Sequence, residues 1–328
     1  MTETDRLYTA GTVEHSATGK ELFSASGKKS GHGTIAWLPA PSYEMHESPP
    51  WRGLPGRPVI ALLDSGVQPH DWLPGGGGQP FVLDARDFGW PDPALDNPPA
   101  TGQFGSHWGH ATFIAGLIRL TAPDARVLSM RVMNSDGKVS ENDAAEALTW
   151  LAGKPEIRVG SDYISVDIVL MAFGRQADPG DDDLKILRKP ISMLSDLGVR
   201  IVASAGNDGA ERPVYPAAFA AEEELSHKSK RTVVSVGALA TPTERAPYSN
   251  SGPWVTKWRK GTSILSIMPL TTKSNQDPRP GFDPIAAPSP GDGYAWWSGT
   301  SFAAAAAAGH LAAGLPAHQA LPEPAVRS

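Results

Sequence analysis

Ser301 has the surroundings that a serine nucleophile needs. It stands in the sequence Gly299-Thr300-Ser301-Phe302, directly before six alanines that form a very strong helix-forming run. A serine at a helix start has its Oγ near free backbone N–H groups and the positive end of the helix dipole, and both favour an oxyanion. An ordinary helix N-cap occupies the same position, so a nucleophilic role requires a base and an orienting acid elsewhere in the chain.

Three further polar side chains come at the ends of predicted elements. Asp64 follows the apolar run 59–63, which is typical of a buried parallel strand, and α/β sheets bind ligands at the carboxyl ends of such strands. His110 opens a helical pattern, and Asn207 follows the apolar run 199–205. Taken singly, Asp64 is more simply interpreted as a turn residue that ends a strand.

Strand-like apolar runs alternate with helical patterns along the chain. Helical patterns lie between most of the five predicted strands, which are 59–63, 127–132, 168–173, 199–205 and 231–237. This alternation predicts an α/β fold with a doubly wound, mostly parallel sheet flanked by helices. The length of 328 residues suits one large α/β domain or two small ones.

Composition predicts three parts of the chain. Residues 1–50 are polar and have too few apolar residues to bury a core, so we expect a mostly irregular arm in which 34–38 pairs as a strand. Residues 51–314 are the expected folded domain, with a long flexible loop at 71–106. The Pro- and Ala-rich residues 315–328 are expected to be a disordered tail.

Composition also argues against several classes of partner. The net charge of −6 and the lack of a basic stripe disfavour nucleic acid, and the lack of cysteine excludes disulfides and thiolate metal sites. The sequence has no apolar run of membrane-spanning length and no signal-peptide core in its first thirty residues, which predicts a cytoplasmic protein without a membrane partner. His107 and His110 have a spacing that zinc ligands use, but no third ligand shares their face, so we expect no metal and no cofactor.

The order of the polar residues matches a known family. Asp, then His, then Ser is the order of the catalytic triad in subtilisins. Residues 64–66 resemble the family's Asp-Thr/Ser-Gly motif, and residues 110–116 resemble its His-Gly-Thr-His-Val-Ala-Gly motif. Residues 204–207 resemble its oxyanion segment, and residues 299–301 its nucleophile motif. The chain therefore resembles a compact, intracellular subtilisin-like serine peptidase (subtilase) over about residues 51–314.

The resemblance implies a role for each reacting group. Ser301 would attack the peptide carbonyl, His110 would take its proton and return it to the leaving amine, and Asp64 would hold and stabilise the imidazole. The side-chain amide of Asn207 and the backbone N–H of Ser301 would bind the oxyanion. The implied activity is that of a serine endopeptidase on protein or peptide substrates. A narrower form of this hypothesis is a dedicated processing peptidase.

The resemblance also implies where substrate binds. The substrate would lie extended beside the strand 171–174, and a pocket for the residue before the scissile bond would have Val214 at its base. Because an apolar base disfavours a buried charge, we expect a neutral, medium-sized apolar residue in this pocket. The peptide bond before Pro216 is expected to be cis, as it often is in the family. The implied substrate-contacting residues are Ala172, Phe173, Gly174, Ala205, Gly206 and Val214.

Several positions depart from the family's pattern without removing a reacting group. Ala111 replaces a glycine, Phe113 replaces a frequent histidine, and Ala305 replaces a common proline. The segment 116–124 is too short for the calcium-binding loop that the family often inserts there, so no calcium is expected. Only 27 residues follow Ser301, so the family's final helix is expected to be missing.

Two other classes of function stay open. One is a binding or regulatory protein on a catalytically silent subtilase scaffold, or one that an activating partner protein assembles. The other is a transpeptidase that passes the same acyl-enzyme to an amine. Retention of all four reacting groups favours the peptidase. The arm 1–50 is expected either to pack on the core or to cap the cleft.

Overall fold

The protein is represented by a computed structural model. It describes residues 7–10, 36–38, 56–74, 80–93, 103–104, 107–135, 137–177, 184–222, 232–269, 273–274 and 293–315.

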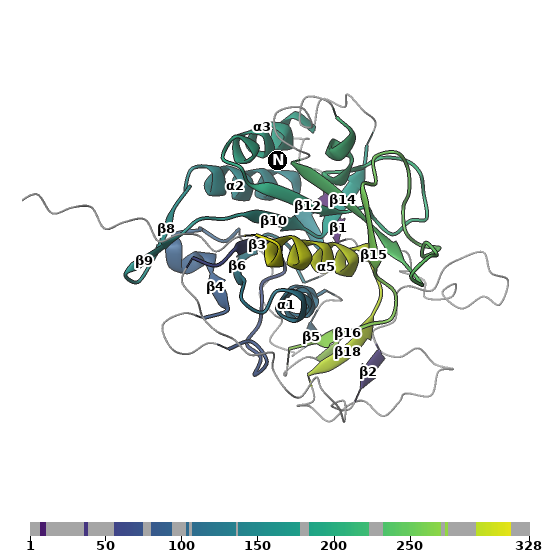
Figure 1. The fold of residues 1–328 in the computed structure, drawn as a ribbon, viewed down its shortest axis with the longest axis horizontal. Coiled ribbons are helices and arrows are strands. Elements are labelled where there is room, and N and C mark those ends of the chain that lie inside the picture. Colours follow the sequence, from purple (N-terminus) through teal and green to yellow (C-terminus); the bar gives the residue numbers. More distant parts are fainter. Residues whose placement is uncertain are drawn as a thin grey trace, which may run out of the picture.

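A parallel seven-stranded sheet forms the centre of the molecule (Figure 1). Its strands in chain order are β3 (Val59–Asp64), β4 (Val82–Asp84), β6 (Arg126–Arg131), β10 (Ile168–Met171), β12 (Arg200–Ser204), β14 (Val233–Leu239) and β15 (Lys257–Lys260). In space they follow the order β15-β14-β12-β10-β3-β6-β4, and every neighbouring pair is parallel. The predicted doubly wound α/β fold is therefore confirmed.

Helices cover both faces of this sheet (Figure 1). On one side lie α2 (Glu141–Ala152) and α3 (Lys185–Asp196), and on the other α1 (His110–Thr121) and α5 (Thr300–Ala313). Successive residues of a strand point to opposite faces, so β3 contributes to two cores. Leu63 packs in the core that contains α2 and α3, whereas Leu62 packs in the core that contains α1 and α5.

In the described part of the chain, four smaller sheets accompany the central one. Their orders are β13-β11-β1-β7, β16-β18-β2, β17-β5 and β8-β9. The strands of these sheets are β1 (Leu7–Ala10), β2 (Ala36–Leu38), β5 (Gln103–Phe104), β7 (Lys138–Ser140), β8 (Ile157–Val159), β9 (Asp162–Ile164), β11 (Phe173–Gln176), β13 (Val214–Tyr215), β16 (Ile264–Ile267), β17 (Lys273–Ser274) and β18 (Tyr294–Trp297). The described residues also form the short 3₁₀ helices η2 (Ala85–Phe88) and η4 (Ala217–Ala221).

The structure tests part of what the sequence predicts outside the central sheet. The strand expected within 34–38 is present as β2, which pairs antiparallel with β18. The expectation of one long loop at 71–106 is wrong, because β4, η2 and β5 lie within it. Most of the arm 1–50 and residues 316–328 of the expected tail lie outside the described residues, so the domain boundaries stay predictions.

The alanine-rich helix α5 is buried on nearly every side. A helix that is apolar all round belongs in a protein interior, and the residues from Ala303 to Ala305 are fully buried. At Gly309 an added Cβ would lie 1.8 Å from Oγ1 of Thr121 in α1, so glycine permits the close approach of the two helices. No helix among the described residues is long and apolar enough to cross a membrane.

Candidate active site

The predicted reacting residues come together at one edge of the central sheet. β12, β10 and β3 are adjacent parallel strands, so their carboxyl ends lie at the same edge. Asp64 is the last residue of β3, Ala172 directly follows β10, and Asn207 follows β12 after two residues. The first turn of α5, which holds Ser301, contacts both Ala172 and Asn207.

Asp64 and His110 form a buried hydrogen-bonded pair. Nδ1 of His110 is 2.9 Å from both carboxylate oxygens of Asp64, and both side chains are fully buried. Oδ1 of Asp64 also accepts a hydrogen bond of 2.7 Å from the backbone N–H of Ser65. A carboxylate acceptor at Nδ1 favours the tautomer that carries its proton there, which leaves a lone pair on Nε2. Nε2 is buried and has no hydrogen-bond partner among the described residues, so it is open to a proton donor.

Aromatic rings hold the imidazole of His110 in place. The centroids of His107, Trp297 and Phe302 lie 5.6, 5.5 and 5.6 Å from that of His110. Phe302 follows Ser301, so these contacts place the start of α5 against the imidazole. In the sequence, the spacing of His107 and His110 indicates only a possible pair of zinc ligands, and no feature of the sequence predicts the contact of Trp297 with His110. Among the described residues, no group of three metal-ligating side chains lies together.

Ser301 is the second residue of α5, and its hydroxyl does not cap the helix. The N-cap is Gly299, so the alternative interpretation of Ser301 as an N-cap residue is wrong. Oγ of Ser301 donates a hydrogen bond of 3.1 Å to the backbone carbonyl of Ala172. In this structure the hydroxyl is therefore turned to the end of β10, and it donates to Ala172 and not to the imidazole of His110.

Two hydrogen bonds fix the Asn207 segment to the start of α5. Oδ1 of Asn207 accepts from the backbone N–H of Thr300 at 2.8 Å, and Oγ1 of Thr300 accepts from the N–H of Gly206 at 3.1 Å. Because Oδ1 is used in this way, the Nδ2 group of Asn207 points away from Thr300. Nδ2 is buried without a hydrogen-bond partner among the described residues, which makes it a donor ready for an incoming acceptor.

Comparison with known proteins establishes the family. Residues 56–328 match the sequence profile of the subtilase family. The chain belongs to the subtilase family. The minor extracellular protease Epr of Bacillus subtilis (strain 168) is 28% identical over 228 residues, which are 66% of this subtilase but only 29% of Epr. Subtilisin BL of Lederbergia lenta is 27% identical over 231 residues, which are 67% of this chain and 70% of that protein.

Solved structures show the same fold. A mutant of the protease domain of PatA has a TM-score of 0.54 at 21% identity, over 79% of this subtilase and 80% of that chain. The prenylagaramide maturation protease PagA has a TM-score of 0.51 at 22% identity, over 77% and 74% of the two chains. At these identities the likeness establishes a subtilisin-like fold.

Val214 of this subtilase lies against the segments 171–174 and 203–206, which the family resemblance implies as the walls of the specificity pocket. A Cβ added to Gly174 would lie 2.6 Å from Cγ1 of Val214, and one added to Gly206 would lie 3.4 Å from its Cγ2. Val214 is only 3% exposed, and Ala172, Phe173 and Ala205 are fully buried. The isopropyl group of Val214 therefore occupies space between the two glycines. The Tyr215–Pro216 peptide bond is cis, as expected.

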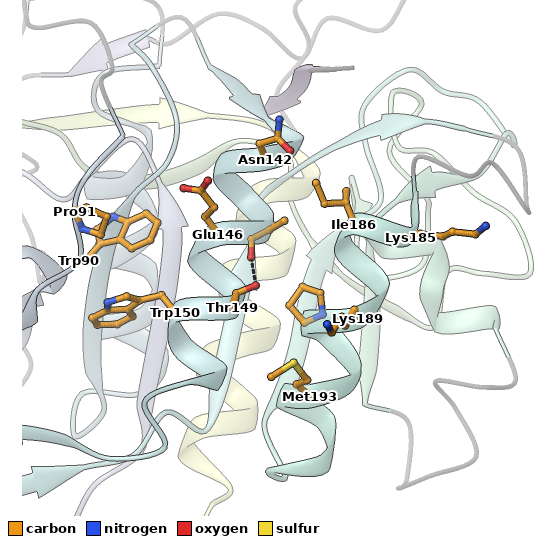
Figure 2. A pocket seen from close by; sticks show the side chains of 12 residues that line it. Trp90, Pro91, Asn142, Glu146, Thr149, Trp150, Lys185, Ile186, Lys189 and Met193 are labelled. Atoms are coloured by element: carbon orange, nitrogen blue, oxygen red, sulfur yellow. Dashed lines mark hydrogen bonds between the residues drawn. The ribbon is translucent and has the colours of Figure 1, made fainter. Parts of the chain in front are cut away.

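A separate surface recess lies between α2 and α3 (Figure 2). It has a volume of about 740 Å³ and is lined in part by Trp90, Trp150, Ile186 and Met193. Figure 2 shows that Thr149 of α2 hydrogen-bonds within its own helix, where Oγ1 donates to the carbonyl of Ala145 at 2.7 Å. None of the predicted reacting residues lines this recess.

His70 ties the loop after β3 to the strand that leads to α5. Its Nε2 donates to the carbonyl of Gly293 at 3.2 Å, because its Nδ1 accepts from the N–H of Trp72 at 3.0 Å. Burial disfavours the protonated ring and lowers the pKa of His70 below its ordinary value of 6.5, although the bond to Gly293 opposes this shift. The neutral ring is therefore the form that joins the two segments.

This lowered pKa predicts a loss of stability in mild acid. Below pH 6.5 the unfolded chain binds a proton that folded His70 resists, so the free energy of unfolding falls with falling pH until the folded-state pKa is reached. The slope from this one group is at most about 1.4 kcal/mol per pH unit. We expect His70→Gln to remove this part of the slope in urea unfolding measured between pH 7.5 and 5. His310→Gln, at an exposed position, is the control, and an unchanged slope in His70→Gln would contradict the assignment.

Proposed function

We propose that this subtilase is a serine endopeptidase that hydrolyses peptide bonds through an acyl-enzyme on Ser301. The observation that supports this most is the buried Asp64–His110 pair, whose Nε2 has no described partner and is available as a base. The first turn of α5 brings Ser301 to the same edge of the sheet as Asn207, whose Nδ2 group has no described hydrogen-bond partner. A base, an orienting carboxylate, a hydroxyl and an oxyanion donor are the parts that acyl transfer needs.

In the proposed mechanism, Oγ of Ser301 leaves the carbonyl of Ala172 and bonds to the carbonyl carbon of the substrate while Nε2 of His110 takes its proton. The π electrons of that carbonyl move to its oxygen, which accepts hydrogen bonds from Nδ2 of Asn207 and the N–H of Ser301. The C–N bond then breaks, and the amine leaves with the proton from His110. Water hydrolyses the remaining ester by the same proton transfers and restores the hydroxyl.

Substrate binds as an extended strand along Phe173 and Gly174 in this proposal. Backbone pairing with β11 supplies affinity that does not depend on sequence, and side-chain pockets supply specificity. The residue before the scissile bond points between Gly174 and Gly206, where Val214 already occupies space. We therefore expect the substrate residue before the scissile bond to be small, glycine or alanine, and not medium-sized.

Replacing Val214 is expected to widen this preference. Val214→Gly should raise kcat/KM for peptides with leucine or phenylalanine before the scissile bond about tenfold or more, since a few buried methyl groups are worth about 1–3 kcal/mol. For peptides with glycine or alanine before the scissile bond, kcat/KM should change less than about threefold. The measurement is a fluorogenic peptide series, normalised to active enzyme, with Val166→Gly as the control. Equal values for all side chains in the wild type would contradict the proposed pocket.

Within this activity we favour a dedicated processing peptidase over a digestive one. A shallow pocket that accepts only small side chains restricts the sites that can be cut. PagA, whose fold is similar, is described as a maturation protease, and a further structural neighbour is described as a lanthipeptide protease. The cytoplasmic location and an activating partner protein stay predictions, which cell fractionation and co-purification test.

One observation favours the alternative of a protein that is silent until a partner activates it. The hydroxyl of Ser301 donates to Ala172 and not to the imidazole of His110. The active peptidase and the silent protein are distinguished by incubating the full chain with casein and detecting new peptide N-termini by mass spectrometry. Cleavage by the chain alone supports the peptidase, and intact casein with folded protein supports the silent form.

A further inference from the structure

One wall of the recess between α2 and α3 is aromatic, and its polar groups already have partners. Trp90 and Trp150 pack edge to face there, with ring centroids 6.0 Å apart (Figure 2). Nε1 of Trp90 donates to the carbonyl of Arg131 at 3.4 Å. Nε1 of Trp150 donates to the carbonyl of Gly89 at 3.2 Å. The two indoles therefore offer apolar surface to an occupant and need no hydrogen bond from it.

The wall on α3 exposes large apolar side chains. α3 turns Leu187, Ile191 and Leu194 into the core, as an amphipathic helix does. Ile186 and Met193 are seven residues apart, so they share a second face of the helix, and each is 39% exposed. Both line the recess and point toward α2 (Figure 2). An apolar hollow of about 740 Å³ is larger than scattered surface side chains produce and is typical of a binding surface.

The shape of the recess fits a helix better than an extended peptide. The lining residues run from Asn142 to Trp150 on α2 and from Lys185 to Met193 on α3, a length of about 12 Å or two helical turns. α2 and α3 bond their backbone groups internally, so they offer none to an extended peptide, whose own backbone would be buried unpaired. A helix satisfies its own backbone and inserts apolar side chains three and four residues apart.

The charged residues that line the recess are more basic than acidic. Lys185 and Lys189 line it from α3, and Glu146 lines it from α2. Nζ of Lys154 lies 4.8 Å from the ring centroid of Trp150 and adds a further positive charge beside the aromatic wall. The whole chain has a net charge of −6, so this excess of lysine is local. Because complementary charge favours the right partner, the occupant should carry acidic residues beside its apolar stripe.

One end of the recess lies close to the proposed substrate strand. Asn142, which lines the recess, directly follows Glu141. Oε1 of Glu141 lies 2.6 Å from Nε of Arg175 in β11. In the proposed function the acyl side of the substrate lies along Phe173 and Gly174. The part of the substrate that is N-terminal to the cut bond therefore leaves Ser301 in the direction of Arg175, toward this end of the recess.

We infer that the recess between α2 and α3 is a docking site for an acidic, amphipathic helix of the substrate protein, N-terminal to the bond that is cut. This inference rests on the proposed function, because it takes β11 as the place where substrate binds. Docking at a second site raises the local concentration of the cleavable segment at the cleft. It adds binding that is equal in the ground state and the transition state, so it lowers KM and leaves kcat unchanged.

The first test measures binding without cleavage, on the full chain with Ser301→Ala. The probe is a fluorescein-labelled helical peptide with leucine at every third or fourth position and glutamate beside the leucines, and its counterpart has lysine for each glutamate. By fluorescence anisotropy, the acidic peptide should bind at least about tenfold more tightly than the lysine peptide. Adding Met193→Glu should weaken the acidic peptide about tenfold, since it puts a like charge in the apolar wall. Leu120→Glu, at a 54% exposed position of α1, is the matched control and should not weaken it.

The second test joins the acidic peptide, through a Gly-Ser linker, to the N-terminus of a fluorogenic segment with alanine before the scissile bond. With the full wild-type chain, the joined substrate should have a KM about tenfold lower than the fluorogenic segment alone, with kcat within about twofold. Lys189→Glu should raise the KM of the joined substrate about threefold and leave that of the short segment unchanged. The matched control is Lys257→Glu, an exposed lysine of β15 that does not line the recess.

The outcomes separate this inference from the proposed function. Equal binding of the acidic and lysine peptides, or equal KM for the joined and short substrates, would overturn the inference, while cleavage of the short segment would leave the proposed function intact. A dimer in sedimentation that Met193→Glu dissociates would assign the recess to a second copy and also overturn it. Binding of the acidic peptide only after removal of residues 316–328 would do the same in favour of the chain's own tail. No cleavage of either substrate by a folded chain that takes no fluorophosphonate would overturn the proposed function.

Discussion

Ser301→Ala is expected to lower kcat about 10⁶-fold, the loss that removal of the nucleophile causes in a subtilisin. The side chain lost donates a hydrogen bond to the end of β10 and directly precedes Phe302, which contacts the imidazole of His110. Alanine is an excellent helix former, so the buried helix should keep its stability. The measurements are kcat on a fluorogenic peptide and thermal unfolding.

The matched control for this change is Ser298→Ala. Ser298 lies three residues earlier, and its hydroxyl accepts a hydrogen bond of 2.9 Å from the N–H of Ser263. Its loss should change kcat less than about threefold, since it removes one partly exposed hydrogen bond and no reacting group. A similar loss of activity in both variants would indicate that Ser301→Ala acts through folding. Full activity of Ser301→Ala would exclude an acyl-enzyme on this residue.

Asp64→Asn is expected to lower kcat about 10⁴-fold while the fold is kept, as the same exchange does in the Ser-His-Asp triad of chymotrypsin-like enzymes. The carboxylate of Asp64 accepts hydrogen bonds from Nδ1 of His110 and from the N–H of Ser65. An amide keeps the acceptor for Ser65 but can present an N–H₂ group to Nδ1. The proton of the imidazole then moves to Nε2, which is no longer a base.

The control for Asp64→Asn is Asp84→Asn. Asp84 also ends a strand of the central sheet, β4, which β6 separates from β3. Its carboxylate accepts a hydrogen bond from the N–H of Arg86 and so caps η2. This exchange should leave kcat within about twofold of the wild type, because no reacting group is touched. Wild-type kcat in Asp64→Asn would mean that the buried pair has a structural role only.

The long central strands and the positions of Asp64 and Asn207 at their carboxyl ends could be predicted from the sequence. A parallel strand that is buried on both faces leaves a run of apolar residues, and β3 and β12 correspond to such runs at 59–63 and 199–205. Asp64 and Asn207 follow these runs and thus fall at the carboxyl edge. The edge strand β4, with three residues, left no such run, and the segment was wrongly expected to be a loop.

Features that depend on contacts between distant segments were not predictable. The pairing of β1 is decided by two strands more than a hundred residues later, and its own residues are few and lie in a polar arm. The position of Val214 against Gly174 and Gly206 depends on the spacing of two segments, so the size of the pocket could not be read from residue types. The rotamer of Ser301 likewise follows from the carbonyl of Ala172, which only the fold brings to it.

Reaction of the full chain with a fluorophosphonate tests the central claim most directly, because such a probe reacts with a serine only when a neighbouring base activates its hydroxyl. The label is mapped by mass spectrometry of proteolytic fragments, in the wild type and in Ser301→Ala and His110→Ala. The account predicts one labelled residue, Ser301, with no label in Ser301→Ala and little in His110→Ala. A folded wild-type chain that takes no label, or a label on another residue, would contradict it.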